Sequence, residues 1–74
     1  MTKYVSRSDK RSGVTGYESG DDFIVVRFHD NTVYKYTYNS AGPEHVESMK
    51  LLAKAQNGLS TYISQHNPIY AVKF

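Results

Sequence analysis

The segment FIVVRFHDNTVYKYTY, residues 23–38, decides the fold of this sequence. Phe23 to Phe28 is a dense run of β-branched and aromatic residues, and Thr32 to Tyr38 alternates strictly, with tyrosine at positions 34, 36 and 38. Both runs favour extended strands, and the Asp30-Asn31 pair between them is typical of a turn. The segment therefore predicts an antiparallel β-hairpin.

Two loop lengths fit this hairpin, and they give opposite registers because a slip of one residue turns every side chain to the other face. A two-residue loop at Asp30-Asn31 pairs Phe28 with Val33, and it places the tyrosines on the face of Phe23, Val25 and Arg27. A three-residue loop over residues 29–31 puts Asn31 in the left-handed conformation that asparagine tolerates. The pairs are then Phe28 with Thr32, Val26 with Tyr34 and Ile24 with Tyr36.

We favour the three-residue loop because it separates an apolar face from a more polar one, as a sheet with one buried face requires. The apolar face then holds Ile24, Val26, Phe28, Tyr34, Tyr36 and Tyr38. The opposite face holds Arg27, Lys35 and Thr37.

A helix is predicted to cover the apolar face. It begins at Pro43, which is preorganised for the first helical position, and Glu44 and Glu47 complement the positive end of the helix dipole. Apolar residues then recur at helical spacing for about four turns, until the stop signal Asn57-Gly58. A second, shorter helix is predicted over residues 60–66, and Pro68 ends it.

The remaining segments predict weaker strands. Residues 3–8 and 14–18 are strand candidates, and Ile69 to Phe74 is either an added edge strand or an ordered tail. The fold class is therefore α+β: a small antiparallel meander of three or four strands, with one main amphipathic helix on one face and a short second helix. Residues 1–74 form a single domain in this interpretation, with a basic N-terminal arm over residues 1–11.

Length and composition exclude several classes of protein. The chain has 74 residues, 39% of them hydrophobic and 22% charged, so it is expected to fold but is too short for a two-domain enzyme. The absence of cysteine excludes a disulfide framework, a thiolate metal site and a thiol nucleophile. Neither a membrane span nor a secretory signal is predicted, and a cytoplasmic location is the default expectation.

The excess positive charge lies at the N-terminus. Residues 1–11 carry four basic side chains against one acidic one, a net charge of +3, whereas residues 12–74 carry five basic against six acidic ones, a net charge of −1. The basic residues of the arm are Lys3, Arg7, Lys10 and Arg11. Such an arm either neutralises nucleic-acid phosphates or is a solvated terminus whose charges aid solubility.

The tyrosines and the cations suggest two different surfaces. Exposed aromatic rings stack on bases in sheet-based RNA binders, yet Tyr34 and Tyr36 share a face that the helix needs, so we expect core packing for both. An RNA-binding surface is better placed on the opposite face, with Arg27 and Lys35, joined by Arg7, Lys10 and Arg11.

No pattern in the sequence predicts an enzyme, a cofactor or a metal site. None of His29, His45 and His66 has a second ligand at i+4 on the same helical face. Glu44, His45 and Glu47 resemble an acid–base group, but the helix dipole explains the glutamates and a surface position explains the histidine. Gly13-Val14-Thr15-Gly16 matches the G-x-x-G of KH domains, although its flanks predict the entry of a strand.

Several motifs in order resemble the KTSC domain family, named for its place at the C-terminus of some lysyl-tRNA synthetases and also found as free-standing bacterial or phage proteins. They are SRS at 6–8, VTGY at 14–17, I-x-V-x-F at 24–28, YKY at 34–36, GLSTYI at 58–63 and Tyr70. Asn31 stands where the family usually has glycine, and Pro68 interrupts a stretch that is more basic and helical in the family. The resemblance implies a role in RNA binding and no catalytic residues, and Tyr34 and Tyr36 match the family's Y-x-Y signature.

We therefore predict a non-catalytic RNA-binding accessory module. The alternative is a protein-interaction module or a small phage-type inhibitor. It would use an edge strand or the open sheet face with Phe23, Val25, Val33 and Lys35.

Overall fold

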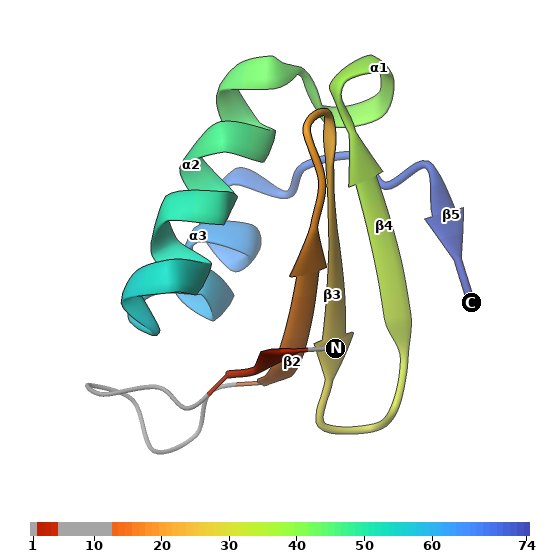
Figure 1. The fold of residues 1–74 in the computed structure, drawn as a ribbon. Coiled ribbons are helices and arrows are strands. Elements are labelled where there is room, and N and C mark those ends of the chain that lie inside the picture. The colour runs from red at the N-terminus through yellow and green to blue at the C-terminus, as the bar shows by residue number, and fades with distance from the viewer. Residues whose placement is uncertain (1, 5–12) are drawn as a thin grey trace.

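The computed structural model describes residues 2–4 and 13–74, and in this part of the chain the sheet has five strands. They are β1 (Thr2–Lys3), β2 (Val14–Ser19), β3 (Phe23–Phe28), β4 (Val33–Thr37) and β5 (Val72–Lys73). The strands follow one another in sequence order, and each neighbouring pair is antiparallel. The helices are α1 (Tyr38–Ala41), α2 (Pro43–Ala55) and α3 (Leu59–His66), with α2 and α3 on one side of the sheet (Figure 1). The predicted α+β class is confirmed, and two short edge strands make the sheet wider than expected.

The β3–β4 hairpin has the three-residue loop and the register that we favoured. Phe28 donates its N–H to the Thr32 carbonyl at 2.8 Å, and Asn31 donates to the Phe28 carbonyl at 2.9 Å. Asn31 adopts the left-handed conformation, with a φ of 68°. Ile24 faces Tyr36 and Val26 faces Tyr34 across the two strands, as predicted.

The core lies between the apolar face of the sheet and the two long helices. The sheet contributes Tyr4, Val14, Ile24, Val26 and Tyr36, α2 contributes Val46, Met49 and Ala53, and α3 begins with Leu59. Ile24, Val26, Val46, Met49 and Leu59 are fully buried. Burial of a side chain of this size stabilises a fold by about 1.5–3 kcal/mol, so these contacts hold the helices on the sheet.

The end of β4 differs from the prediction. The alternating pattern extended the strand to Tyr38, but the strand ends at Thr37, where a capping box begins the short helix α1. Ser40 donates its N–H to Thr37 Oγ1 at 3.1 Å, and Thr37 donates its N–H to Ser40 Oγ at 3.0 Å. Tyr38 therefore leaves the sheet and packs at the edge of the core from α1.

The two long helices lie close to their predicted bounds. α2 begins at Pro43 as expected but ends before the Asn57-Gly58 signal. Gln56 adopts the left-handed conformation, with a φ of 53°, and its N–H reaches the carbonyls of Ala53 and Leu52. Gly58, with a φ of 82°, directly precedes α3.

Both ends of the described chain join the sheet. β1 covers Thr2–Lys3, earlier than the predicted strand over 3–8, of which residues 5–8 lie outside the described residues. Tyr4 donates its N–H to the Thr15 carbonyl at 3.1 Å, and its buried hydroxyl accepts the N–H of Leu59 at 3.2 Å. At the other end, Val72 pairs with Lys35 and Lys73 with Tyr34, which resolves the C-terminal segment as a short edge strand.

Replacing Tyr4 with phenylalanine is expected to destabilise the fold by about 1–3 kcal/mol, because the N–H at the start of α3 loses its buried acceptor while the ring stays in place. Chemical denaturation of both proteins measures this difference. Thr2→Ala, at an exposed position of β1, is the control and should change stability by less than about 0.5 kcal/mol. Equal stability of Tyr4→Phe and the wild type would contradict the assigned bond.

Candidate functional site

One face of the sheet faces away from α2 and α3, and we call it the open face. The register gives two rows across it: Lys3, Gly16, Arg27 and Val33 in one, and Glu18, Val25, Lys35 and Val72 in the other. Phe23 lies on the same face at the start of β3. The C-terminal segment lies beside β4 within the sheet rather than across this face, so it does not shield the open face (Figure 1).

Long side chains cover the apolar centre of the open face. Val25 is only 9% exposed, although the helices lie on the other side of the sheet. The Lys35 ammonium lies 4.7 Å from the centre of the Phe23 ring, a favourable cation–π contact. Gly20 leaves room for that ring, because a Cβ at position 20 would overlap the Phe23 side chain. The lysine stem and the aromatic ring thus form one packed unit with a charged end.

Arg27 is held in place by a neutral partner. Its Nε donates to Thr15 Oγ1 at 3.2 Å, and the same hydroxyl donates to the Arg27 carbonyl at 3.3 Å. The register of β2 shifts between Val14 and Gly16, which leaves Thr15 as the extra residue of a β-bulge. The contact with Thr15 therefore positions the guanidinium. Because threonine is uncharged, this contact does not neutralise the positive charge of Arg27.

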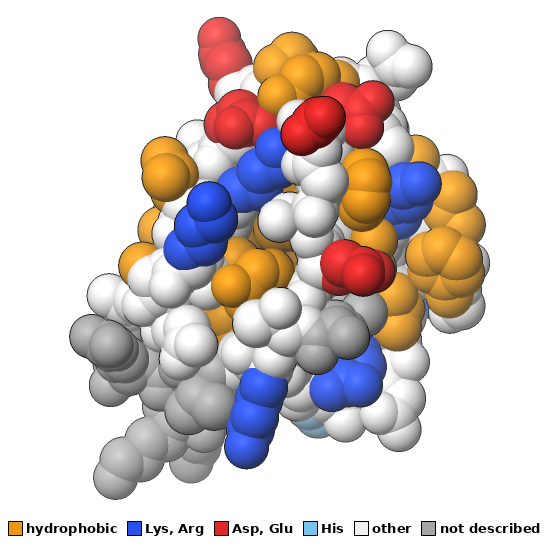
Figure 2. Space-filling view, viewed as in Figure 1, with side chains coloured by type: hydrophobic (Ala, Val, Ile, Leu, Met, Phe, Trp, Pro, Cys, Tyr) orange, Lys and Arg blue, Asp and Glu red, His pale blue; other side chains and the backbone are white. Residues whose placement is uncertain are grey.

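The charges are distributed unevenly over the molecule, although each end carries both signs: Lys50 lies in the acidic cluster, and Asp30 lies in the hairpin loop that follows β3. Acidic side chains cluster where α2 begins and where β2 turns into β3 (Figure 2), and they belong to Asp21, Asp22, Glu44 and Glu47. Arg27 lies near the other end, one residue before Phe28 and the hairpin loop. Arg7, Lys10 and Arg11 lie outside the described residues, but their segment joins the described fold at Tyr4 and Gly13, and Gly13 accepts the N–H of His29 at 2.7 Å.

Tyr34 and Tyr36 both lie on the helix-side face, as predicted, but only Tyr36 is fully part of the core. Tyr36 is 3% exposed, whereas the half-buried ring of Tyr34 meets Phe28 at 5.5 Å and Tyr70 at 4.8 Å between ring centres. These rings line an open cleft of about 800 Å³ between the hairpin and the segment after α3. Its volume lies within the range of small-molecule pockets, and its walls combine aromatic and apolar side chains with the polar loop residues His29 and Asp30.

The sequence interpretation missed this cleft because it did not assign a pairing partner to the C-terminal segment. Pairing of β5 with β4 brings Lys73 over the Tyr34 ring, at 5.7 Å from its centre, and Tyr70 beside it. The alternation of residues 69–74 was the available signal. It indicated a strand but not the edge to which the strand would add.

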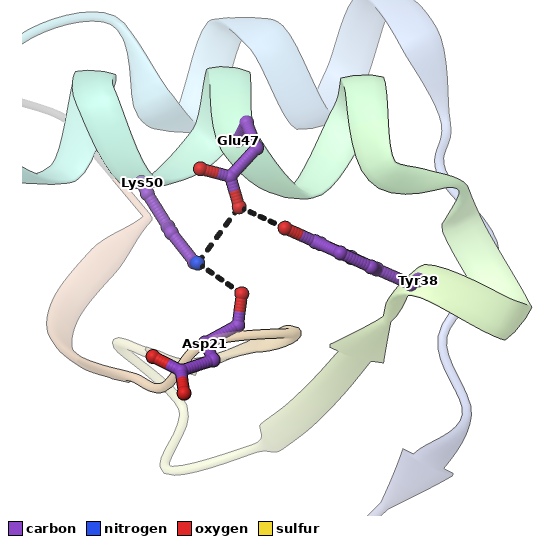
Figure 3. Close-up of polar contacts among 4 residues, drawn as sticks. All are labelled: Asp21, Tyr38, Glu47 and Lys50. Carbon is purple, nitrogen blue, oxygen red and sulfur yellow. Dashed lines mark hydrogen bonds and ion pairs between the residues drawn. The ribbon is translucent and has the colours of Figure 1, made fainter.

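A second polar cluster ties α1 and α2 to the β2–β3 turn (Figure 3). The Tyr38 hydroxyl donates to Glu47 Oε2 at 2.7 Å, and Lys50 Nζ lies 2.8 Å from the same oxygen and 2.8 Å from the Asp21 carbonyl. The hydrogen bonds from Lys50 and Tyr38 lower the pKa of Glu47, while the bond to Glu47 raises the pKa of Tyr38. These groups satisfy one another, so the cluster fits a structural anchor.

The suspected acid–base group does not converge on one point. Glu47 turns to Tyr38 and Lys50, whereas His45 Nδ1 lies 2.6 Å from the Tyr62 hydroxyl on α3. Within residues 2–4 and 13–74, no group of three or more histidine, aspartate or glutamate side chains could hold a metal ion. The G-x-x-G sequence opens β2 at its bulge, as the strand prediction required.

Comparison with known proteins gives no match to a family model, a curated protein or a solved structure. The resemblance to the KTSC family therefore stays a prediction from the motifs. No helix in the described part of the chain is long and apolar enough to cross a membrane.

Tyr36 is expected to make the fold sensitive to alkaline pH. Burial, with a smaller effect of Tyr34 and Tyr70, raises the pKa of Tyr36 from 10.0 to about 12. A group whose pKa is higher in the folded state contributes stability that is fully present below the unfolded pKa and is lost as pH rises through the folded one. Denaturant unfolding between about pH 10 and 12 should show a steeper loss for the wild type than for Tyr36→Phe. Parallel losses in the two proteins would contradict burial of an ionisable Tyr36.

Proposed function

We propose that the protein is a non-catalytic RNA-binding accessory module whose open face contacts RNA phosphates. The observation that carries this proposal is the register, which places Lys3, Arg27 and Lys35 on one sheet face. Lysine and arginine bind phosphates with little dependence on sequence, and each contact releases counterions from the nucleic acid. We therefore assign these three cations to contacts with the RNA backbone rather than to recognition of bases.

The distribution of charge supports the same face. The described residues carry six basic and six acidic side chains. Their net charge is therefore zero, and it does not by itself attract a polyanion. The open face, however, holds three of the basic residues in its strands and one acidic residue, Glu18. The main acidic cluster lies at the far end of the molecule, and the end that contains Arg27 carries Asp30 alone in its loop, so a polyanion meets less negative charge at this end.

The proposal also includes three cations of the N-terminal segment, which lie outside the described residues. Arg7, Lys10 and Arg11 lie between Tyr4 and Gly13, the two points where the segment joins the described fold. Tyr4 follows Lys3 in the chain, and Gly13 precedes Val14, which pairs with Phe28 next to Arg27. The proposal is that these cations and those of the open face contact the same RNA strand.

An exposed ring near the open face offers a place for base stacking. Phe74 is 71% exposed, and its N–H donates to the Val33 carbonyl at 2.8 Å, beside the row that contains Arg27. Stacking on an aromatic ring tolerates any base and typically contributes about 1–3 kcal/mol per base. Phe74 is thus better suited to stacking than Tyr36, which the core buries.

Charge reversal on the open face is expected to weaken RNA binding. Arg27→Glu with Lys35→Glu should lower affinity for a single-stranded RNA at least ~10-fold at low salt and reduce the salt slope by about 1.4, since two phosphate contacts are lost. The control is Lys54→Glu, at an exposed position of α2 on the other side of the sheet, which makes the same charge change as each of the two open-face substitutions made alone. Fluorescence anisotropy at several salt concentrations measures both effects, with circular dichroism to confirm folding. An equal loss of RNA affinity in Lys54→Glu would show that the RNA is attracted by the overall charge of the protein and not by the open face.

Arg7→Glu with Lys10→Glu tests the N-terminal segment in the same assay, and we expect a further loss that also fades with salt. If the wild type binds neither single-stranded nor structured RNA at low salt, the proposal fails, because electrostatic attraction is strongest there.

The exposed edge at β5 favours a second candidate, a protein-interaction module. Val72 is 42% and Phe74 is 71% exposed, and β5 is the last strand of the described sheet, so its outer edge can accept another strand. A pull-down from the native host, with and without nuclease, distinguishes the two candidates. A partner that survives nuclease and is lost with folded Phe74→Asp supports protein binding, whereas nuclease-sensitive recovery supports RNA.

A further inference from the structure

Two histidines that are distant in the sequence meet on the surface of the helical layer. His45 lies in the first turn of α2, and His66 is the last residue of α3, one turn after Tyr62. Packing of the two helices brings the His45 and His66 ring centres to 5.6 Å. A search for ligands at i+4 on one helix misses this pair, because its members come from different helices.

From this arrangement we infer that His45 and His66 bind a divalent transition-metal ion, with Tyr62 as a positioning residue. Two imidazoles that share one ion, each at a metal–nitrogen distance of about 2.1 Å and in tetrahedral geometry, have ring centres about 5 Å apart. The observed separation of 5.6 Å is close to this value. Water completes the coordination, because the site has two protein ligands.

Tyr62 fixes which nitrogen of His45 faces the ion. The Tyr62 hydroxyl lies 2.6 Å from His45 Nδ1, and a hydroxyl can accept a hydrogen bond as well as donate one. When Nδ1–H donates to the Tyr62 oxygen, the lone pair of His45 is on Nε2 and is free to bind a metal. Metal-bound histidines commonly donate the other ring N–H in this way, which orients the ring.

Tyr62 also positions the second ligand. The rings of Tyr62 and His66 lie 4.2 Å apart at an angle of 31°, which is a close, nearly stacked contact. His66 is exposed and His45 is half-buried, so an ion and its water ligands can reach both rings from solvent. One tyrosine thus contacts both ligands while its own ring packs partly against the core.

The donor atoms select the class of metal. Imidazole nitrogens suit zinc, copper and nickel, whereas magnesium and calcium require oxygen ligands. Since the ion joins the start of α2 to the end of α3, it binds the folded state preferentially and raises its stability.

The test uses the untagged protein and Zn²⁺, with Mg²⁺ as the control ion. Calorimetry and the histidine ring resonances in NMR spectra should show one Zn²⁺ bound to the wild type and no response to Mg²⁺. His66→Ala should lower Zn²⁺ affinity at least ~10-fold, while His29→Ala, which removes a histidine on the hairpin loop, should retain wild-type affinity.

Tyr62→Phe separates a positioning role from packing alone. It keeps the aromatic ring and removes the hydroxyl, and we expect a loss of Zn²⁺ affinity of about 10-fold with an unchanged stoichiometry. Saturating Zn²⁺ should also raise the melting temperature of the wild type and leave that of His66→Ala unchanged. Absence of Zn²⁺ binding by the wild type, or equal losses for His29→Ala and His66→Ala, would overturn the inference.

Discussion

The left-handed conformation of Asn31 sets the register on which the rest of the structure depends. It closes a three-residue loop, so Val26 faces Tyr34 and Ile24 faces Tyr36. A loop shorter by one residue would turn Tyr34 and Tyr36 away from α2 and would bring Lys35 toward the core. A buried lysine without a partner is far more costly than the local strain at one asparagine, so the core and the loop select the same register.

The same register divides the functional features between two faces. The helix-side face carries the core and, at its margin, the aromatic cleft around Tyr34. The open face carries Lys3, Arg27 and Lys35 over a packed apolar centre. The sheet therefore separates the interactions that hold the protein together from those available to a partner, and charge on the open face can change with little effect on the core.

Local patterns were sufficient to predict the elements that are defined locally. Alternation predicted the β3–β4 hairpin, Pro43 and the helical spacing predicted α2, and the shared face of Arg27 and Lys35 followed from the register. The strand pattern concealed α1, because Thr37 is both the last residue of the alternation and the cap of the helix. Pairing of β5 with β4 and the meeting of His45 with His66 depend on tertiary packing, which periodicity within one segment does not report.

The bond between the Tyr4 hydroxyl and the Leu59 N–H joins residues that are 55 positions apart. On the ribosome, chains emerge from the N-terminus at about 5–20 residues per second, so Tyr4 waits seconds for its partner. The β3–β4 hairpin has no such delay, because all its contacts lie within one short segment. In synthesis the hairpin can therefore form seconds before the bond between Tyr4 and Leu59, so the contact of Tyr4 with the start of α3 is still missing when the hairpin is already complete.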